Sequence, residues 1–185
     1  MFPKKLITFL SIALIAWSFK GDKDAYAIFD DLGKKVSYNK IFSKADKADI
    51  ILFGEQHNNP INNWLELELT KDFFETVNED ITIGIQYYQT DDQLLINEYL
   101  GAHLDYKTFS NRVSLGDNSH DEYLPLLDFA RKHQLTFVAT GLPKRYAKMV
   151  SKEGFKAFNH LSKQATKYIC PIPFQYDKKQ KGYAD

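Results

Sequence analysis

Short apolar runs that alternate with helical patterns are the feature that most limits how this chain can fold. Three runs are typical of buried strands: residues 48–54, 81–88 and 136–140. Gly84 in the second run indicates a close approach by a neighbouring backbone. Strand–helix–strand order is typical of a parallel sheet with helical crossovers, so we predict an α/β fold with a mostly parallel sheet flanked by helices. Because three strands are few for such a sheet, we expect the fold to be incomplete on its C-terminal side.

The segments between these runs carry helix start and stop signals. Asn59-Pro60 is typical of a helix start, and apolar residues continue with helical spacing to about Val77. Thr90 and Gln93 have the spacing of a capping box, and the helix after them is expected to end at Gly101. Further helices are expected at residues 38–49, 105–112, 121–133 and 143–168, the last broken around residue 151.

Composition excludes several classes of protein. The chain has 185 residues, and its 24 basic and 24 acidic residues give no net charge, so it lacks the basic footprint of a nucleic-acid-binding protein. A hydrophobic content of 44% is too high for a disordered chain. The lone Cys170 forbids an internal disulfide and a Cys-rich zinc site, and a free cysteine there is unremarkable if it is buried. We predict one domain, residues 28–185.

The N-terminus is typical of a secretory signal. Pro3-Lys4-Lys5 gives a positive start, and the apolar run that follows has 14 residues, fewer than the ~20 that span a bilayer. Ala25-Tyr26-Ala27 has the form of a cleavage site, but charged residues precede it. Residues 1–27 are therefore a cleaved signal peptide or an uncleaved anchor, with a buried N-terminal helix as the alternative. We expect export to the periplasm or cell envelope and membrane contact only through this segment.

Polar residues follow the first predicted strand, at the end where parallel sheets bind ligands. Gly54 allows a sharp turn, and Glu55 and His57, two residues apart, can point the same way. A carboxylate beside an imidazole suits a metal, a haem edge or a proton transfer. The alternative is that Glu55 caps the helix that starts near Pro60 and that His57 fills a loop.

The other two strand ends give weaker signals. Tyr87 and Tyr88 point to opposite faces of an ideal strand, so at most one can reach a ligand unless the strand bends, and core packing is the commoner role. Arg145 stands at a predicted helix start. It is either a clamp for a propionate or another carboxylate, or a solvated charge.

Several stretches, in order and with sensible spacing, match one family. They are residues 50–60 (with Gly54-Glu55-Gln56-His57 inside), 90–95, 123–126, 143–147 and 182–183. Over about residues 28–185 the chain resembles the ChaN-like haem-binding lipoproteins of the Tiki superfamily. The resemblance implies an α/β fold, an envelope location, and haem binding linked to iron uptake. It also implies, for some members, a homodimer that encloses two stacked haems.

The resemblance also assigns roles to individual residues. Glu55 and His57 fall on the family's Gly-Glu-x-His signature, and Arg145 and Tyr146 fall on its late motif. Related branches of the superfamily are metal-dependent hydrolases built on the same signature. Glu55 and His57 are therefore candidate haem-site residues and, alternatively, candidate ligands of a divalent metal.

The chain departs from the family pattern at several positions. Asn62-Asn63 stand where paired histidines are usual, and Gln86 stands where the second strand usually ends in Glu. Gln cannot ionise, so it is a poor base and a weak ligand for a hard metal. The lipid-bearing Cys is missing, and family chains usually continue further. The first two changes remove groups that hydrolysis would need.

We therefore expect a non-catalytic haem-binding or iron-uptake protein of the envelope. Because a Tyr phenolate can ligate haem iron, the candidate ligands are His57, Tyr87, Tyr88 and Tyr146. The alternatives are a metal-dependent hydrolase of the Tiki or erythromycin-esterase-like type and a fragment with no function of its own. Each binding hypothesis requires Glu55, His57 and Arg145 to line one pocket.

Overall fold

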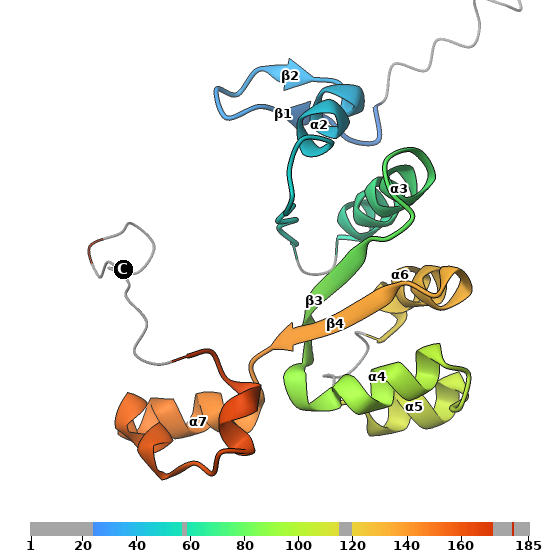
Figure 1. Cartoon of the computed structure of the whole chain (residues 1–185). Helices are drawn as coiled ribbons and strands as arrows, with labels where there is room; N and C mark the ends of the chain where they lie inside the picture. The colour runs from blue at the N-terminus through green and yellow to red at the C-terminus, as the bar shows by residue number, and fades with distance from the viewer. Residues whose placement is uncertain (1–23, 57–58, 115–119, 172–178, 180–185) are drawn as a thin grey trace, which may run out of the picture. The chain divides into compact units, whose positions relative to one another are not determined.

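The computed structural model describes residues 24–56, 59–114, 120–171 and 179. The chain divides into two compact units, residues 1–51 and 52–185 (Figure 1). In the described part, no helix combines the length and the apolar character that crossing a membrane requires. The predicted signal segment falls mostly on residues 1–23, which lie outside the described residues.

The N-terminal unit is a small hairpin followed by one helix. Strands β1 (Ile28–Phe29) and β2 (Lys35–Val36) pair antiparallel. The Asp30 carboxylate accepts hydrogen bonds from two backbone N–H groups of the turn between them. Gly33 supplies the positive φ of that turn, +74°. Helix α2 (Tyr38–Ala45) confirms the helix predicted there.

The larger unit is organised around a two-stranded parallel sheet. Strands β3 (Thr82–Gln89) and β4 (Thr136–Gly141) confirm two of the three predicted strands and the parallel arrangement. Burial alternates along both strands, so that Ile85 and Phe137 are almost fully enclosed while their neighbours are exposed. One face of the sheet therefore belongs to the core.

A glycine allows the close approach of the two strands, but it is not the predicted one. A Cβ atom on Gly141 would lie 2.2 Å from the carbonyl oxygen of Gln86 and 2.7 Å from that of Tyr88. At Gly84 a Cβ would meet only the Thr140 methyl group, at 3.4 Å, an ordinary contact. The tight position is thus at the carboxyl end of β4, where pairing with β3 shifts register between Ile85 and Gln89.

Four helices surround this sheet (Figure 1). They are α3 (Pro60–Thr76), α4 (Gln93–Leu100), α5 (Tyr106–Arg112) and α6 (His120–His133), and all four were predicted to within a few residues. Asn59 caps α3, because its side chain accepts hydrogen bonds from two backbone N–H groups of the first turn. Aromatic and aliphatic side chains from α4, α5 and α6 pack against the buried face of the sheet, with Ile96, Phe109 and Leu127 fully enclosed.

The C-terminal part of the described chain follows β4. Helix α7 (Lys144–Glu153) is followed by the 3-10 helices η2 (Phe155–His160) and η3 (Ala165–Tyr168). The break falls at Gly154, which has a φ of +69°, rather than around residue 151. Cys170 is exposed, not buried.

The predicted capping box does not form. The Thr90 hydroxyl donates to the Tyr168 carbonyl instead, at 3.0 Å. The Gln93 side chain donates to the Phe137 carbonyl (2.8 Å) and accepts from the Ala139 N–H (2.7 Å), both on β4. Gln93 therefore satisfies backbone groups of β4 that β3 leaves unpaired, in the way that a further strand would.

The prediction of a strand at residues 48–54 is wrong. This segment forms no strand in the described part of the chain, and Ile50 and Leu52 are 77% and 93% exposed. An apolar run shows that a segment can enter a sheet, but a strand exists only where a neighbour supplies hydrogen-bond partners. Residues 48–54 also span the division between the two units.

Candidate functional site

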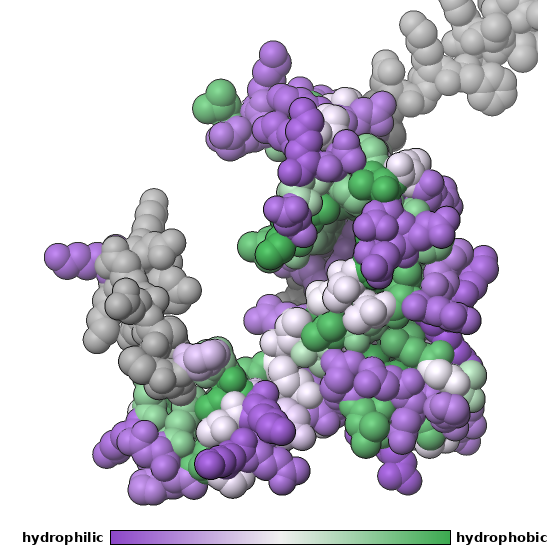
Figure 2. All heavy atoms as spheres, in the orientation of Figure 1, coloured by the Kyte–Doolittle hydropathy of each residue, from purple (hydrophilic) through white to green (hydrophobic). Residues whose placement is uncertain are grey.

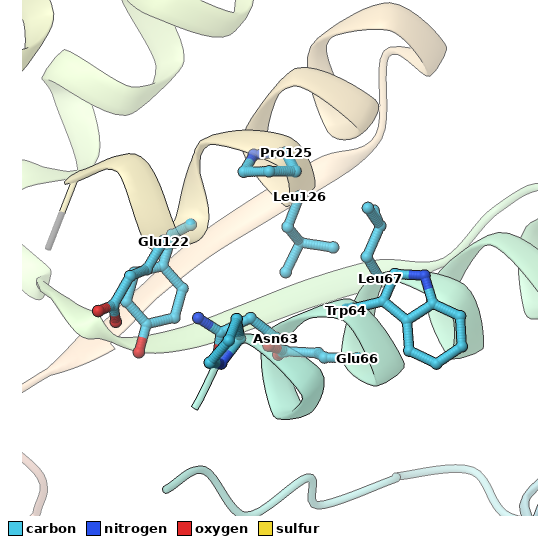
Figure 3. A pocket seen from close by; sticks show the side chains of 9 residues that line it. Asn63, Trp64, Glu66, Leu67, Glu122, Pro125 and Leu126 are labelled. Atoms are coloured by element: carbon cyan, nitrogen blue, oxygen red, sulfur yellow. The ribbon is translucent and has the colours of Figure 1, made fainter. Parts of the chain in front are cut away.

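A groove lies between α3 and α6 in the larger unit (Figure 3). Its volume is about 560 Å³. Its lining is mainly apolar, from Trp64 and Leu67 on α3 and Pro125 and Leu126 on α6. Figure 3 shows the Leu67 and Leu126 side chains on facing sides of this space, with the Trp64 indole beside them. Trp64 is 47% exposed, so its ring offers a large aromatic surface to a bound molecule.

Glu55 lies at the polar part of this groove. Its carboxylate accepts a short hydrogen bond from the hydroxyl of Tyr123, a buried α6 residue that lines the groove. Asn59 occupies the capping position of α3, so the expectation that Glu55 caps this helix is wrong. Burial, followed by the hydrogen bond to Glu55, raises the pKa of Tyr123 far above its ordinary value. Tyr123 therefore remains a neutral hydrogen-bond donor.

A second carboxyl group adjoins Glu55. Glu66, on α3, also lines the groove and is hydrogen-bonded to Glu55. Burial, with a smaller contribution from the charge of Glu55, raises the pKa of Glu66 to about 7. The charge of Glu66 therefore changes near neutral pH.

Tyr87 and Tyr88 have different environments. The Tyr87 ring lies 4.7 Å from that of Tyr123, so it adjoins the Glu55 cluster. Tyr88 is 1% exposed and packs against Phe109 and Phe137 in the core, and burial raises its pKa strongly. The irregular register of β3 brings both rings within 6.4 Å of Tyr123. Of the two, Tyr87 is the one beside the groove.

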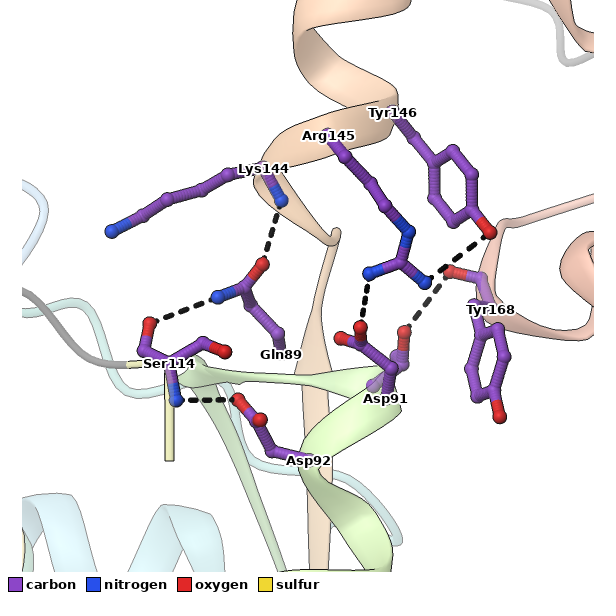
Figure 4. Close-up of polar contacts among 9 residues, drawn as sticks. Gln89, Asp91, Asp92, Ser114, Lys144, Arg145, Tyr146 and Tyr168 are labelled. Atoms are coloured by element: carbon purple, nitrogen blue, oxygen red, sulfur yellow. Dashed lines mark hydrogen bonds and ion pairs between the residues drawn. The ribbon is translucent and has the colours of Figure 1, made fainter. Parts of the chain in front are cut away.

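Arg145 and Tyr146 form a separate cluster with Asp91 (Figure 4). The Arg145 guanidinium donates a short hydrogen bond to the Asp91 carboxylate and a second, 3.3 Å long, to the Tyr146 hydroxyl. It also lies over the Tyr146 ring, 4.4 Å from its centroid. The Arg145 side chain is 50% exposed. Tyr146 itself is buried, and the second Asp91 oxygen is enclosed without a hydrogen-bond partner among the described residues.

Two buried polar side chains hold the backbone around this cluster. The Gln89 side chain donates to the Ser114 carbonyl at 2.9 Å and accepts from the Lys144 N–H at 2.6 Å, so it caps the start of α7 (Figure 4). Asp92 accepts from the Ser114 N–H at 3.2 Å. Burial raises the pKa of Asp92, and the hydrogen bond from the Ser114 N–H opposes this increase. These contacts fix α7, and with it Arg145, to the end of β3.

The predicted site residues thus fall into two clusters that share no residue. Glu55 and Tyr87 adjoin the groove, whereas Arg145 and Tyr146 belong to the Asp91 cluster. His57 lies outside the described residues, so a pocket shared by all of them stays a prediction. Within the described residues, no group of three or more His, Cys, Asp or Glu side chains could hold a metal ion.

The positions that depart from the family pattern have local roles. The Asn62 side chain donates to the Gly54 carbonyl at 3.3 Å, which ties the Glu55 segment to α3. Asn63 lines the groove. Gln86 is exposed on β3, and its carbonyl oxygen faces Gly141.

Sequence reasoning missed Glu66 and the role of Tyr123. Tyr123 was noted only as part of a matching stretch, and Glu66 is one of several acidic residues on α3. The sequence offered one signal for Glu66, which is its position on the helix. Glu66 is a carboxyl residue one to two helical turns after the α3 start, with the spacing Trp64-x-x-Leu67 around it, on a helix expected to pack.

Comparison with known proteins gives one match. The model of the family described as "Haem-binding uptake, Tiki superfamily, ChaN" matches residues 41–185. No curated protein and no solved structure matches the chain significantly. The matched range contains both clusters and the groove, and it covers most of the chain. The chain therefore belongs to the ChaN family of haem-binding uptake proteins in the Tiki superfamily.

Proposed function

We propose that this protein binds haem in the groove between α3 and α6. The family supports a role in haem binding or uptake, and the groove is the observation that supports this site. Its volume of about 560 Å³ lies within the usual range for small-molecule sites, ~300–1,000 Å³. Apolar and aromatic side chains make up most of its lining, which suits the broad, apolar faces of a haem.

The lining fits a macrocycle in detail. The exposed Trp64 ring offers a flat surface, and Leu67 and Leu126 supply aliphatic contacts on the two sides of the groove. Burying such surface against a ligand is favourable, at roughly 25 cal/mol per Å² removed from water. Bound haem would add iron chemistry, while Trp64, Leu67 and Leu126 would exclude water from its faces.

Charge limits the orientation of the ligand. Glu66 and Glu122 line the groove, and Glu55 adjoins it. Propionates are negatively charged, so they are repelled from these carboxylates and are expected to point toward solvent or toward a basic side chain. Arg145, half-exposed and paired with only one carboxylate in the described chain, is the basic residue that we assign to a propionate.

Two of the four candidate axial ligands are set aside because their side chains are buried. Tyr88 is enclosed, and the Tyr146 hydroxyl is buried against Arg145. Tyr87 adjoins the groove through Tyr123, and His57 follows Glu55 by two residues. We therefore propose Tyr87 and His57 as the ligand candidates. A non-catalytic role, location in the envelope and assembly as a homodimer are further parts of this proposal.

A haem titration of the full chain tests the proposed site. We expect ferric haem at micromolar concentration to give a shifted Soret band, and Trp64→Ala to weaken haem affinity at least tenfold because it removes the largest apolar surface of the groove. Phe155→Ala is the matched control, since Phe155 is similarly exposed (42% against 47%) but lies on η2. If both variants weaken binding equally, the groove is not the site.

Ligand assignment needs a separate comparison. Tyr87→Phe or His57→Ala should change the absorption and electron paramagnetic resonance spectra of the haem complex, while Tyr88→Phe should leave both spectra unchanged. A spectrum that responds to Tyr88→Phe alone would overturn the assignment.

A metal-dependent hydrolase is the second candidate, and the Glu55–Glu66 pair favours it. A carboxyl group with a pKa of about 7 is suited to general acid–base work near neutral pH. Metal analysis of the purified protein separates the two functions. Stoichiometric zinc or manganese that is lost on Glu55→Gln supports the hydrolase and removes support from the haem proposal.

A further inference from the structure

The chain has no net charge, but its charged residues are unevenly distributed along the sequence. Residues 143–171, which include α7, η2 and η3, contain seven basic residues and one acidic residue, a net charge of +6. Residues 52–80, which include α3, contain seven acidic residues and one basic residue, a net charge of −6. A concentration of one sign on a small region produces a local field that the net charge of the chain conceals.

The lysines of the basic region are free to meet a partner. All six are exposed: Lys144, Lys148, Lys152, Lys156, Lys163 and Lys167. None of them has an ion-pair partner within the described residues. Lys144, Lys148 and Lys152 follow one another at intervals of four residues in α7, so they lie along one side of the helix. The opposite side, with Tyr146, packs on η2 through Phe158.

Apolar side chains are exposed among these lysines. Leu142, just before α7, is 45% exposed, and Phe155, just after it, is 42% exposed. Figure 2 shows hydrophilic residues over much of the α7 region with hydrophobic residues between them. Basic side chains interspersed with exposed aliphatic and aromatic groups are the combination that the interface of an anionic bilayer attracts.

We propose that the α7–η2–η3 region, which we call the basic surface, binds the headgroups of an anionic lipid bilayer. The lysine ammonium groups meet the lipid phosphates, and Phe155 and Leu142 enter the boundary between headgroups and acyl chains. This contact uses the lysines of the region and not Arg145, which is assigned to a propionate. It adds to the membrane contact that the sequence predicts for the N-terminal segment.

A bilayer fits the basic surface better than a nucleic acid does. Arg145, its one arginine, is bound to Asp91 and is assigned to a haem propionate, so its guanidinium is not left to read the phosphates or bases of a nucleic acid. The remaining cations are lysines, which act as point charges and need no particular partner geometry. Exposed Phe155 and Leu142 gain little from a phosphate backbone, whereas a bilayer can bury them.

Vesicle co-sedimentation of the full chain tests this proposal. The two vesicle types are phosphatidylcholine alone and phosphatidylcholine with 30% phosphatidylglycerol. We expect tighter binding to the anionic vesicles, and a triple variant, Lys148→Gln, Lys152→Gln and Lys156→Gln, to lose about 100-fold of that affinity. The control variant Lys34→Gln, Lys44→Gln, Lys47→Gln removes the same charge from exposed lysines of the N-terminal unit. It should retain the binding of the unaltered chain.

Further measurements separate the alternatives. Binding to neutral vesicles reports the N-terminal segment and should be equal in all variants. Phe155→Ala should weaken binding to anionic vesicles several-fold and leave any binding to a DNA duplex unchanged. Equal loss in the two triple variants, or tighter binding to the duplex than to anionic vesicles, would overturn the proposal. Circular dichroism spectra that match those of the unaltered chain confirm that each variant is folded.

Discussion

Two clusters of the larger unit each hold a partly buried acid, with different partners. Glu66, in the groove, is hydrogen-bonded to another carboxyl group, Glu55, and its pKa rises to about 7. Asp91, at the end of β3, instead binds the Arg145 guanidinium, and the hydrogen bond to Asp91 raises the pKa of Arg145. One cluster therefore changes charge near neutral pH, and the other is a fixed ion pair.

The difference shows that burial and the partner together decide what an acidic residue can do. Burial contributes most to the raised pKa of Glu66 and the charge of Glu55 adds to it, whereas Asp91 is paired with a cation. A ligand with negative groups therefore meets less repulsion in the groove as the pH falls. Each cluster adjoins the carboxyl-terminal end of β3, one through Tyr87 and the other through Asp91, which follows the strand. Gly141 of β4 packs against this end of β3, so a change there tests whether the clusters are independent.

The largest effect is expected from Gly141→Ala, which disturbs the strand ends that carry both clusters. The added Cβ would meet two backbone carbonyl oxygens of β3, at 2.2 and 2.7 Å, so the strands must separate. We expect a loss of about 3 kcal/mol in the free energy of unfolding, measured by urea denaturation. Gly84→Ala is the matched control, with a change below ~1 kcal/mol. Equal effects of the two substitutions would show that the strand ends are not the tight point.

The second-largest effect is expected in the pH dependence of the free energy of unfolding. The pKa of Glu66 is about 7 in the folded chain and 4.5 for an ordinary Glu, so between these values the folded state binds more protons than the unfolded state. Stability due to Glu66 is therefore fully present below pH 4.5 and is lost as the pH rises to 7. Discounted for solvent screening, the loss is roughly 2 kcal/mol.

Glu66→Gln isolates that contribution. The amide is neutral at every pH, so the variant should be more stable than the unaltered chain at pH 8 and nearly equal to it at pH 5. Urea unfolding at both pH values measures the difference. A difference that does not change with pH would mean that Glu66 is ionised throughout this range.

The smallest effect is expected from the ion pair. Because the Arg145 side chain is 50% exposed, Arg145→Gln should cost about 1 kcal/mol in dilute buffer and less in 1 M salt. Lys71→Gln, which breaks the exposed pair between Lys71 and Glu68 on α3, is the control and should cost about 0.3 kcal/mol. A loss that is insensitive to salt would show that packing on Tyr146, rather than charge, holds Arg145.

Most helices and two strands could be predicted because their signals are local. Asn59-Pro60 starts α3 as expected, and the β-branched run of β4 forms a strand. The run at residues 48–54 gave a similar signal, yet Leu52 is 93% exposed. Strand formation depends on a partner far away in the chain, which a local pattern does not contain. The same reason explains why Gln93 binds β4 instead of capping its own helix.

The candidate site was predicted in part. The resemblance identified the family, and the signature directed attention to Glu55, which does lie beside a groove. Sequence reasoning did not find Glu66, because its position near the start of α3, between Trp64 and Leu67, does not show which carboxyl group it meets. It also expected Arg145 and Glu55 to line one pocket, which stays a prediction; the contacts of the described residues place them in two clusters that share no residue.

The sequence by itself determined the helices, the parallel pair of strands and the family, because propensity, capping and motif spacing act over a few residues. Only the tertiary structure decided which carboxyl groups meet, since Glu55 and Tyr123 are 68 residues apart and Asp91 and Arg145 are 54 apart. Packing brought each acid to its partner, and for Glu66 burial, with a smaller contribution from Glu55, raised the pKa.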